Sequence, residues 1–342
     1  MAPNIKEKAR LVDEAPLAAP APEPPAPGAG PREYALRLHV ALKFAYWHLG
    51  ALYGLWLAPQ ARLATVLFNM VLFVGMGLGT SVGAHRLWAH RAFKAAAPLQ
   101  ALLLLLQTLA SQHCVVNWVR DHRLHHKYTD SDADPYSARR GWWFSHAGWV
   151  LYRKHPEVVS RGGHVDVSDL MANPLLRFQK KYYYRLNFLL AFVLPVVIPV
   201  FLWGESWRHA HCLQLLSLLA ISHLVFCINS LAHASRPRHP RRRRQPYDTA
   251  DTSVQSDLLY ALGFGEGHHN YHHAFPSDYR LSESGMKYFN YTNALIEFFE
   301  RIGWAWDLKR ASPEMIAKRA LRTGDGTHPR SLHVNDGFSN SP

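Results

Sequence analysis

The chain has 342 residues, of which 48% are hydrophobic, and a formal net charge of +13 with its 22 histidines neutral. Its apolar residues gather in long stretches, which argues against an ordinary soluble domain. Only three cysteines occur, Cys114, Cys212 and Cys227, and none forms a Cys-x-x-Cys pair. This argues against a disulfide framework or a cysteine-built zinc site.

The N-terminal segment, residues 1–37, begins with a polar stretch rich in proline and alanine. It lacks the charged, apolar and small-residue regions of a cleaved signal peptide. We expect a disordered cytosolic leader.

Four apolar stretches follow, each near the ~20 residues that an α-helix needs to cross a bilayer. They cover about residues 38–58, 63–84, 186–203 and 212–232, and the first and fourth contain more polar residues than the other two. Two short turns would lie on one face of the membrane. The Lys- and Arg-rich remainder would lie on the other, which the positive-inside rule makes cytosolic. The charge therefore has a topological cause, and we expect no nucleic-acid partner.

These patterns predict an all-α membrane protein with four transmembrane helices and a cytosolic cap of residues 85–185 and 233–310. Residues 311–342 would form a cytosolic tail. A fifth apolar stretch, Pro98–Val116, complicates this topology. If it crossed the membrane, the histidine-rich segments would fall on opposite faces. We expect it to lie on the membrane or inside the cap.

Histidines gather in four short segments: HRLWAH (85–90), HRLHH (122–126), NSLAH (229–233) and HHNYHH (268–273). Residues three or four apart share one side of a helix, so the H-x-x-H-H spacings indicate metal ligation. His85 and His90 are five apart, which indicates either an unwound helix or a second metal. The candidate ligands are His85, His90, His122, His125, His126, Asn229, His233, His269, His272 and His273.

Nine imidazoles are too many for one structural zinc ion, which takes four ligands. They suit two metal ions. Imidazole binds iron, copper, nickel and zinc, so the ligand type does not choose among these metals.

The longer phrases GAHRLWAHRAFKA, RDHRLHHKYTDSDADPYSARRGWWFSHAGWVLYRKHP, GEGHHNYHHAFPSDYR and RTGDGTHP carry a resemblance. The chain resembles the integral-membrane acyl-CoA desaturases of the stearoyl-CoA (Δ9-type) family over about residues 38–330, most of all the insect branch. The resemblance implies a histidine-ligated di-iron centre (two Fe) in an enzyme of the endoplasmic reticulum membrane. The implied reaction introduces a double bond, Δ9 by default, into a fatty acyl-CoA. It uses O2 and electrons from cytochrome b5, which an NADH-dependent reductase reduces.

The resemblance also implies roles for single residues. One iron would take His85, His90, His126 and His273, with Asn229 acting through a water. The other would take His122, His125, His233, His269 and His272. Acyl-CoA would contact Arg120, Asp121, Arg153 and Lys154 with its head group, and Trp118 and Trp149 with its tail. Asp121, Asp134 and Glu266 stand beside the histidine segments and are candidates to hold the outer nitrogens of the ligands.

Some positions depart from the family or stay open. His268 stands where relatives usually have Phe, and could be a spectator or a competing ligand. His113 replaces a polar residue near the CoA contacts. The segment HPRRRRQ (239–245), with the run Arg241–Arg244, is either a solvated loop near anionic lipid or a docking surface for cytochrome b5. Phe73 and Gly77 are expected where the acyl tunnel ends, and the small Gly77 would leave room for a long chain.

Two rival functions use the same histidines. A histidine-box membrane hydroxylase would add an OH group to a fatty acid instead of forming a double bond. A non-enzymatic membrane zinc-binding protein would hold zinc and consume no oxygen. The residues leave open the double-bond position, the cis or trans outcome, the chain length and the oligomeric state.

Overall fold

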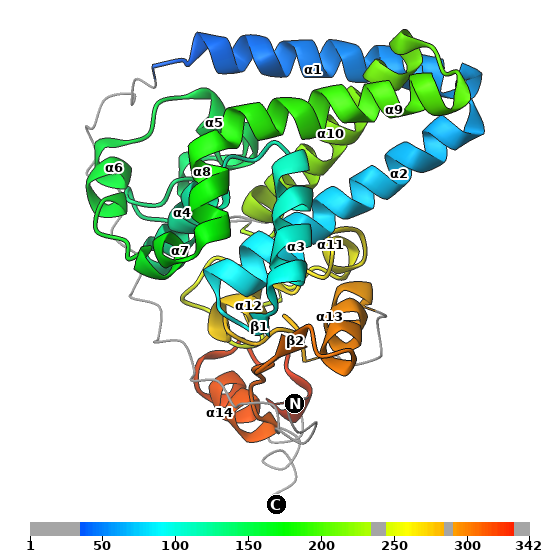
Figure 1. Ribbon diagram of the computed structural model, residues 1–342. Helices are drawn as coiled ribbons and strands as arrows, with labels where there is room; N and C mark the ends of the chain where they lie inside the picture. Colours follow the sequence, from blue (N-terminus) through cyan, green and yellow to red (C-terminus); the bar gives the residue numbers. More distant parts are fainter. Residues whose placement is uncertain (1–34, 234–243, 284–289, 332–342) are drawn as a thin grey trace, which may run out of the picture.

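The computed structural model describes residues 35–233, 244–283 and 290–331 (Figure 1). The expected leader up to residue 34, residues 239–243 of the basic segment and residues 332–342 of the tail lie outside the described residues. Within the described part the protein is mostly helical with two short strands, as expected for an all-α chain.

In the first half of the chain the elements are α1 (Leu38–Leu57), η1 (Ala58–Gln60), α2 (Leu63–Leu78), η2 (Gly79–Ala89), β1 (Lys94–Ala95), α3 (Ala97–Leu109), α4 (Val115–Tyr128), η3 (Ala138–Arg140), η4 (Phe144–Gly148) and α5 (Trp149–Leu151). In the second half they are α6 (Pro156–Gly162), α7 (Ser168–Ala172), α8 (Pro174–Asn187), η5 (Phe188–Val193), α9 (Leu194–Trp203), α10 (Trp207–Leu231), α11 (Asp257–Leu262), α12 (His269–Ala274), α13 (Tyr291–Arg301), β2 (Ala305–Trp306) and α14 (Pro313–Thr323). The two strands pair antiparallel, Lys94 with Trp306 and Ala95 with Ala305.

Three continuous helical segments among the described residues are long and apolar enough to cross a membrane: Leu63–Ala89, Pro174–Trp203 and Trp207–Leu231. The first joins α2 to η2, and the second joins α8, η5 and α9. Helix α1 has the length of a span, 20 residues, but a less apolar composition. The three candidate spans fit a membrane protein, and the crossing by α1 stays a prediction.

The two short turns between the paired helices lie against each other. The Arg62 N–H donates to Glu205 Oε2 (2.8 Å), and the Thr65 hydroxyl donates to the same oxygen (2.7 Å). Figure 1 shows these turns at one end of the molecule, far from α12 and α14. Both turns therefore lie at one end of the molecule, as the pairing of the apolar stretches predicted.

The fifth apolar stretch forms α3, with only 13 residues. At 1.5 Å per residue it is about 20 Å long, too short for a hydrocarbon core of about 30 Å. Helix α3 packs closely on η2, because a Cβ atom placed on Gly79 would lie 2.2 Å from the backbone nitrogen of Gln107. The expectation of a non-spanning helix agrees with this length.

A hydrophobic core lies behind the histidine-bearing segments. It joins Trp88 of η2, Leu99 of α3, Val115 of α4, Leu176 of α8 and Ile296 of α13. Because these side chains are buried against one another, the core holds η2 and α4 in a fixed relation.

Candidate metal centre

The segment that carries His85 and His90 is a π-helix. In η2 the hydrogen bonds run from residue i to i+5, and the His90 N–H donates to the His85 carbonyl (3.1 Å). The two rings therefore meet, with their centroids 4.8 Å apart. A widened helical turn thus explains the five-residue spacing.

Helices α4 and α12 each present an i,i+4 histidine pair. On α4 the rings of His122 and His126 are 4.6 Å apart. On α12 the rings of His269 and His273 are 4.7 Å apart. Asn270 of α12 instead hydrogen-bonds the Asp248 carbonyl (2.8 Å). One side of α12 therefore faces the other histidines, and Asn270 hydrogen-bonds the segment that contains Asp248.

All nine expected histidines come together, in two clusters. The first holds His85, His90, His122, His126 and His272, and the second holds His125, His233, His269 and His273. Within each cluster the candidate ligand atoms all lie within 4.8 Å of one another.

The division of histidines that the resemblance implied is wrong for three residues. His122 and His272 lie in the cluster of His85, and His273 lies in the cluster of His233. The reason is helical periodicity, because residues at i and i+4 share a face. His122 therefore stays with His126, and His269 stays with His273.

The nitrogens that meet are Nε2 atoms. The Nε2 atom of His272 lies 3.0 Å from that of His85 and 2.9 Å from that of His126. The Nε2 atoms of His90 and His122 are 2.8 Å apart. In the second cluster the Nε2 separations are 3.2 Å for His125 and His233 and 3.3 Å for His269 and His273. Two nitrogens bound to one ion at about 2.1 Å lie roughly 3 Å apart when their bonds are near a right angle.

Two of the acids expected beside the histidines hold their outer nitrogens. The Nδ1 atom of His85 lies 2.8 Å from Glu266, and that of His125 lies 3.0 Å from Asp134. Both carboxylates can only accept when ionised, so both rings carry their proton on Nδ1. Asp121 differs from this expectation, because it pairs with Arg120 and Lys154.

Three further side chains contact outer histidine nitrogens in the same way, and the sequence analysis did not identify them. Asp251 lies 3.0 Å from Nδ1 of His273, and Thr252 lies 3.0 Å from Nδ1 of His233. The hydroxyl of Tyr136 lies 3.3 Å from Nδ1 of His122. None of these stands within a histidine segment, and no sequence signal marks them.

The proton positions show that the clusters fit a metal ion. The hydroxyl of Thr252 donates to Asp130, so it accepts from Nδ1 of His233. His125 also carries its proton on Nδ1, so at 3.2 Å two Nε2 lone pairs face each other. A bound cation removes this repulsion, and imidazole is a ligand that iron accepts.

The environment also keeps six of these histidines neutral. Burial, followed by the neighbouring histidines, holds the pKa of His90, His122, His126, His269 and His272 well below the usual range. Burial lowers the pKa of His233 to about 3. Neutral imidazoles keep a lone pair for a metal.

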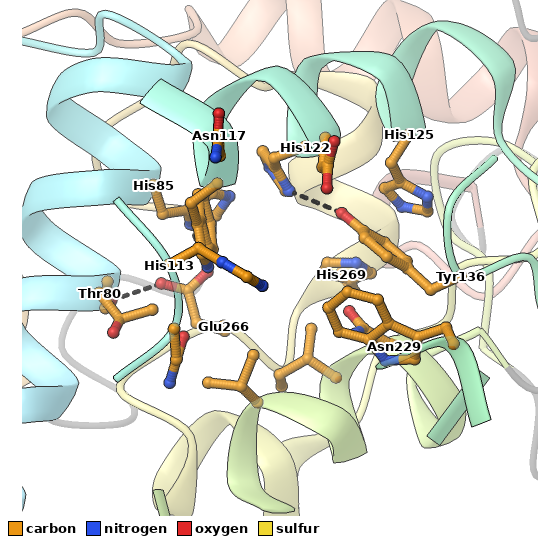
Figure 2. Close-up of a pocket in the computed structure, with 17 residues that line it drawn as sticks. Thr80, His85, His113, Asn117, His122, His125, Tyr136, Asn229, Glu266 and His269 are labelled. Carbon is orange, nitrogen blue, oxygen red and sulfur yellow. Dashed lines mark hydrogen bonds and ion pairs between the residues drawn. The ribbon is translucent and has the colours of Figure 1, made fainter. Parts of the chain in front are cut away.

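A cavity of about 760 Å³, including its open mouth, runs along the clusters (Figure 2). His85, His122, His125 and His269 line one wall, and the expected tail contacts Trp118 and Trp149 also line it. Apolar atoms form most of the surface of the cavity, although several of the lining residues are polar. The cavity therefore suits a long apolar molecule that passes beside the histidines.

The cavity reaches the surface at His113, an exposed lining residue, and we call this side the mouth. Asp121 lines it, while Arg120 and Lys154 reach the cavity through their ion pairs with Asp121. Arg153 is exposed and is absent from the described lining. His113 lines the cavity together with Asp121, so the expectation that it lies near the proposed CoA contacts agrees with the structure.

Asn229 lines the same cavity, one helical turn before His233. His233 belongs to the second cluster. Because Asn229 precedes it by four residues, Asn229 is better placed for the second cluster than for the His85 cluster, to which the resemblance assigned it.

His268 faces away from both clusters. Its Nδ1 lies 2.7 Å from the Ser282 hydroxyl and its Nε2 lies 3.0 Å from Asp257. Its ring stacks on Tyr260, with the centroids 4.1 Å apart. Both ring nitrogens are thus engaged, which favours the spectator interpretation.

The hypothesis that Gly77 leaves room for a long chain stays a prediction, and the space at its own Cβ position is occupied. A Cβ atom on Gly77 would lie 1.8 Å from Cζ of Phe264, so the ring of Phe264 already fills that space. Phe73 lies beside the same ring, with the centroids 6.1 Å apart.

Comparison with known proteins points to one family. The model of the fatty acid desaturase family matches residues 63–305, which include both clusters. The chain is 48% identical to an acyl-CoA Delta(11) desaturase of Spodoptera littoralis over 303 residues, 88% of each chain. It is 46% identical to an acyl-CoA Delta-9 desaturase of Acheta domesticus over 288 residues, 83% of this chain and 78% of the other. It is 44% identical to stearoyl-CoA desaturase 5 of Bos taurus over 281 residues, 82% of each chain.

Proposed function

The chain belongs to the fatty acid desaturase family, and from that membership we propose that it is an acyl-CoA desaturase of the endoplasmic reticulum membrane. It introduces one double bond into a saturated fatty acyl-CoA. The observation that carries the proposal is the cavity whose wall holds histidines of both clusters.

Two iron ions would be held by the two clusters, one by His85, His90, His122, His126 and His272, the other by His125, His233, His269 and His273. Asn229 would serve the second, because it precedes His233 on the same helix. Iron, with O2 as co-substrate and electrons from a donor, supplies the oxidising power that unactivated methylene groups require. Glu266, Asp134 and Asp251 orient the ligands through their Nδ1 protons.

The cavity would bind the acyl chain and exclude water from it. Two polar groups of the cavity wall, the side-chain amide of Gln112 and the indole nitrogen of Trp149, are buried without a partner. This favours the binding of a polar part of the substrate near them. Buried polar groups usually have partners, and the thioester region of an acyl-CoA could supply them. Arg120, Lys154 and the exposed Arg153 would attract the phosphates of CoA.

The proposed electron donor is cytochrome b5 with its NADH-dependent reductase, on the strength of the family resemblance. Exposed basic residues near the clusters, such as Lys127 and Arg139, would favour an acidic partner. Both termini and the cap would be cytosolic, with four helices, including α1, crossing the membrane.

The test is expression in a yeast that lacks its own acyl-CoA desaturase, with mass-spectrometric mapping of double bonds in the lipids. We expect one new class of unsaturated product, lost together with bound iron in His126→Ala. The matched control is His164→Ala, which changes an exposed histidine of the cap. The mapping also reads the double-bond position, for which Δ9 is the default.

The rival functions give different results in the same assay. Hydroxylated lipids would identify a hydroxylase. Stoichiometric zinc with no oxidised lipid in iron-replete cells would identify a zinc-binding protein. Either result would overturn the proposal.

A further inference from the structure

A second, smaller cavity of about 260 Å³ adjoins the main one. The two share five lining residues, Thr80, Ser81, Val225, Ile228 and Glu266. None of the residues at the polar mouth, such as Asp121 and His113, lines the smaller cavity. The smaller cavity therefore extends the main one on the side away from the mouth.

The residues that line the smaller cavity alone are Gly77, Ile221, Leu224, Gly263 and Phe264, and Phe264 has the largest side chain among them. The three atoms nearest to a Cβ placed on Gly77 all belong to the Phe264 ring, at 1.8 to 2.3 Å. Tyr291 supports the ring from another direction, with the centroids 5.6 Å apart. The ring thus rests directly on the backbone of α2.

The backbone of Phe264 is held firmly in an uncommon conformation. Its φ angle is +58°, in the left-handed region that residues other than glycine seldom adopt. Its carbonyl accepts hydrogen bonds from the Ser81 hydroxyl (3.3 Å), Arg86 Nη2 (3.3 Å) and the Thr292 hydroxyl (3.2 Å). Three donors on one carbonyl keep the residue in place.

The same network reaches the first histidine cluster. Arg86 is fully buried and pairs with Glu266 (3.0 Å), and Glu266 holds His85 (2.8 Å). The distance between the Phe264 ring and the cluster is therefore set by short, charged contacts rather than by loose packing.

We propose that Phe264 ends the acyl cavity and thereby determines how many carbons of the substrate fit beyond the metal centre. This inference rests on the proposed desaturase function. A chain with more carbons beyond the reacting ones would overlap the ring, while a shorter chain would leave apolar space unfilled. Phe264, rather than Gly77 itself, is then the residue that determines chain length.

The experiment uses the full chain in the desaturase-deficient yeast, supplied with saturated fatty acids of 14 to 20 carbons. We expect Phe264→Ala to raise the ratio of longer to shorter unsaturated products about tenfold, the size of effect typical of methylene discrimination in an apolar pocket. The conservative Phe264→Leu should shift the ratio less, in the same direction. Phe298→Ala is the control, because it removes an exposed ring on α13.

Gly77→Ala tests the same contact from the other side. The added methyl group would press the ring into the smaller cavity, so the profile should move toward shorter chains. The clash should also lower the thermal unfolding midpoint of Gly77→Ala. Combining Gly77→Ala with Phe264→Ala should remove both effects, because the methyl group then has space.

The outcomes separate the inference from the function on which it rests. An active wild type with unchanged chain-length ratios in Phe264→Leu and Gly77→Ala would overturn the inference alone. A wild type without unsaturated product would overturn the proposed function. If Phe264→Ala fails to accumulate, the other two variants decide.

Discussion

At the scale of single residues, His85, His125 and His273 use their two ring nitrogens differently. Nε2 points into a cluster, and Nδ1 of His85, His125 and His273 meets a carboxylate. Such outer partners fix the ring orientation and raise the basicity of the ligand. A site built only from imidazoles thus still depends on acids that do not touch the metal.

Asp251→Asn tests this dependence at an acid that the sequence did not reveal. The carboxylate is buried, and its Oδ2 lies 3.0 Å from Nδ1 of His273. Losing its charge should lower iron affinity about 10- to 100-fold, measured as iron per purified chain during titration with a chelator.

The control for that experiment is Asp166→Asn. Asp166 is exposed and accepts from the Ser168 N–H (2.8 Å), a role that asparagine also fills. Equal iron retention in Asp251→Asn and in the control would contradict the role of Asp251.

At the scale of elements, the widened turn of η2 decides how the first cluster forms. A regular α-helix places residues five apart on different faces, because it turns 100° per residue. The π-helical hydrogen bond between His90 and His85 returns both rings to one side. Helix α3 packs closely against this segment.

Two glycine substitutions test how closely α3 packs against η2 and the end of α2. In Gly79→Ala the new methyl group would meet the backbone of α3, 2.2 Å from Gln107 N and 2.4 Å from Leu106 C. In Gly75→Ala it would meet only Cδ2 of Leu106, at 3.0 Å.

Since a backbone cannot turn aside as a side chain can, Gly79→Ala should lower the free energy of unfolding by about 1–3 kcal/mol more than Gly75→Ala. Thermal unfolding in detergent would show this as a lower midpoint. Equal midpoints for the two variants would contradict the close contact between η2 and α3.

At the scale of the whole molecule, the hairpin turns and the histidine-bearing α12 lie far apart (Figure 1). The two hairpin turns meet at one end through Arg62, Thr65 and Glu205, and the histidine clusters lie in the cap. With four spans, residues before α1 and residues of the cap share one side of the membrane, and the hairpin turns lie on the other.

Labelling with a membrane-impermeant thiol reagent in sealed microsomes tests whether α1 crosses. Leu36→Cys, before α1, and Ser160→Cys, in the cap, should react, whereas Gln60→Cys, between α1 and α2, should react only after permeabilisation. All three positions are exposed. The unsubstituted chain gives the background from its own cysteines. Equal reactivity of Leu36→Cys and Gln60→Cys would show that α1 does not cross.

Much of the site was predictable because its chemistry is local in the sequence. The H-x-x-H-H spacing puts His122 and His126 on one side of a helix wherever that helix lies. Asp134 and Glu266 lie close to histidine segments, and both contact a ligand ring. Asp251 stands 22 residues before His273, in a loop whose path no local pattern determines.

The sequence by itself determined that the chain is helical, that it has apolar segments of membrane-spanning length and that nine histidines are candidate ligands of a metal centre. These properties follow from hydrophobic length and residue type, which need no knowledge of distant contacts. Only the tertiary structure decided which histidines share a cluster, which outer groups hold them and that Phe264 fills the space at Gly77. Those features depend on distances of a few ångströms between segments far apart in the chain, and the packing of α4, α12 and the loops around them sets those distances.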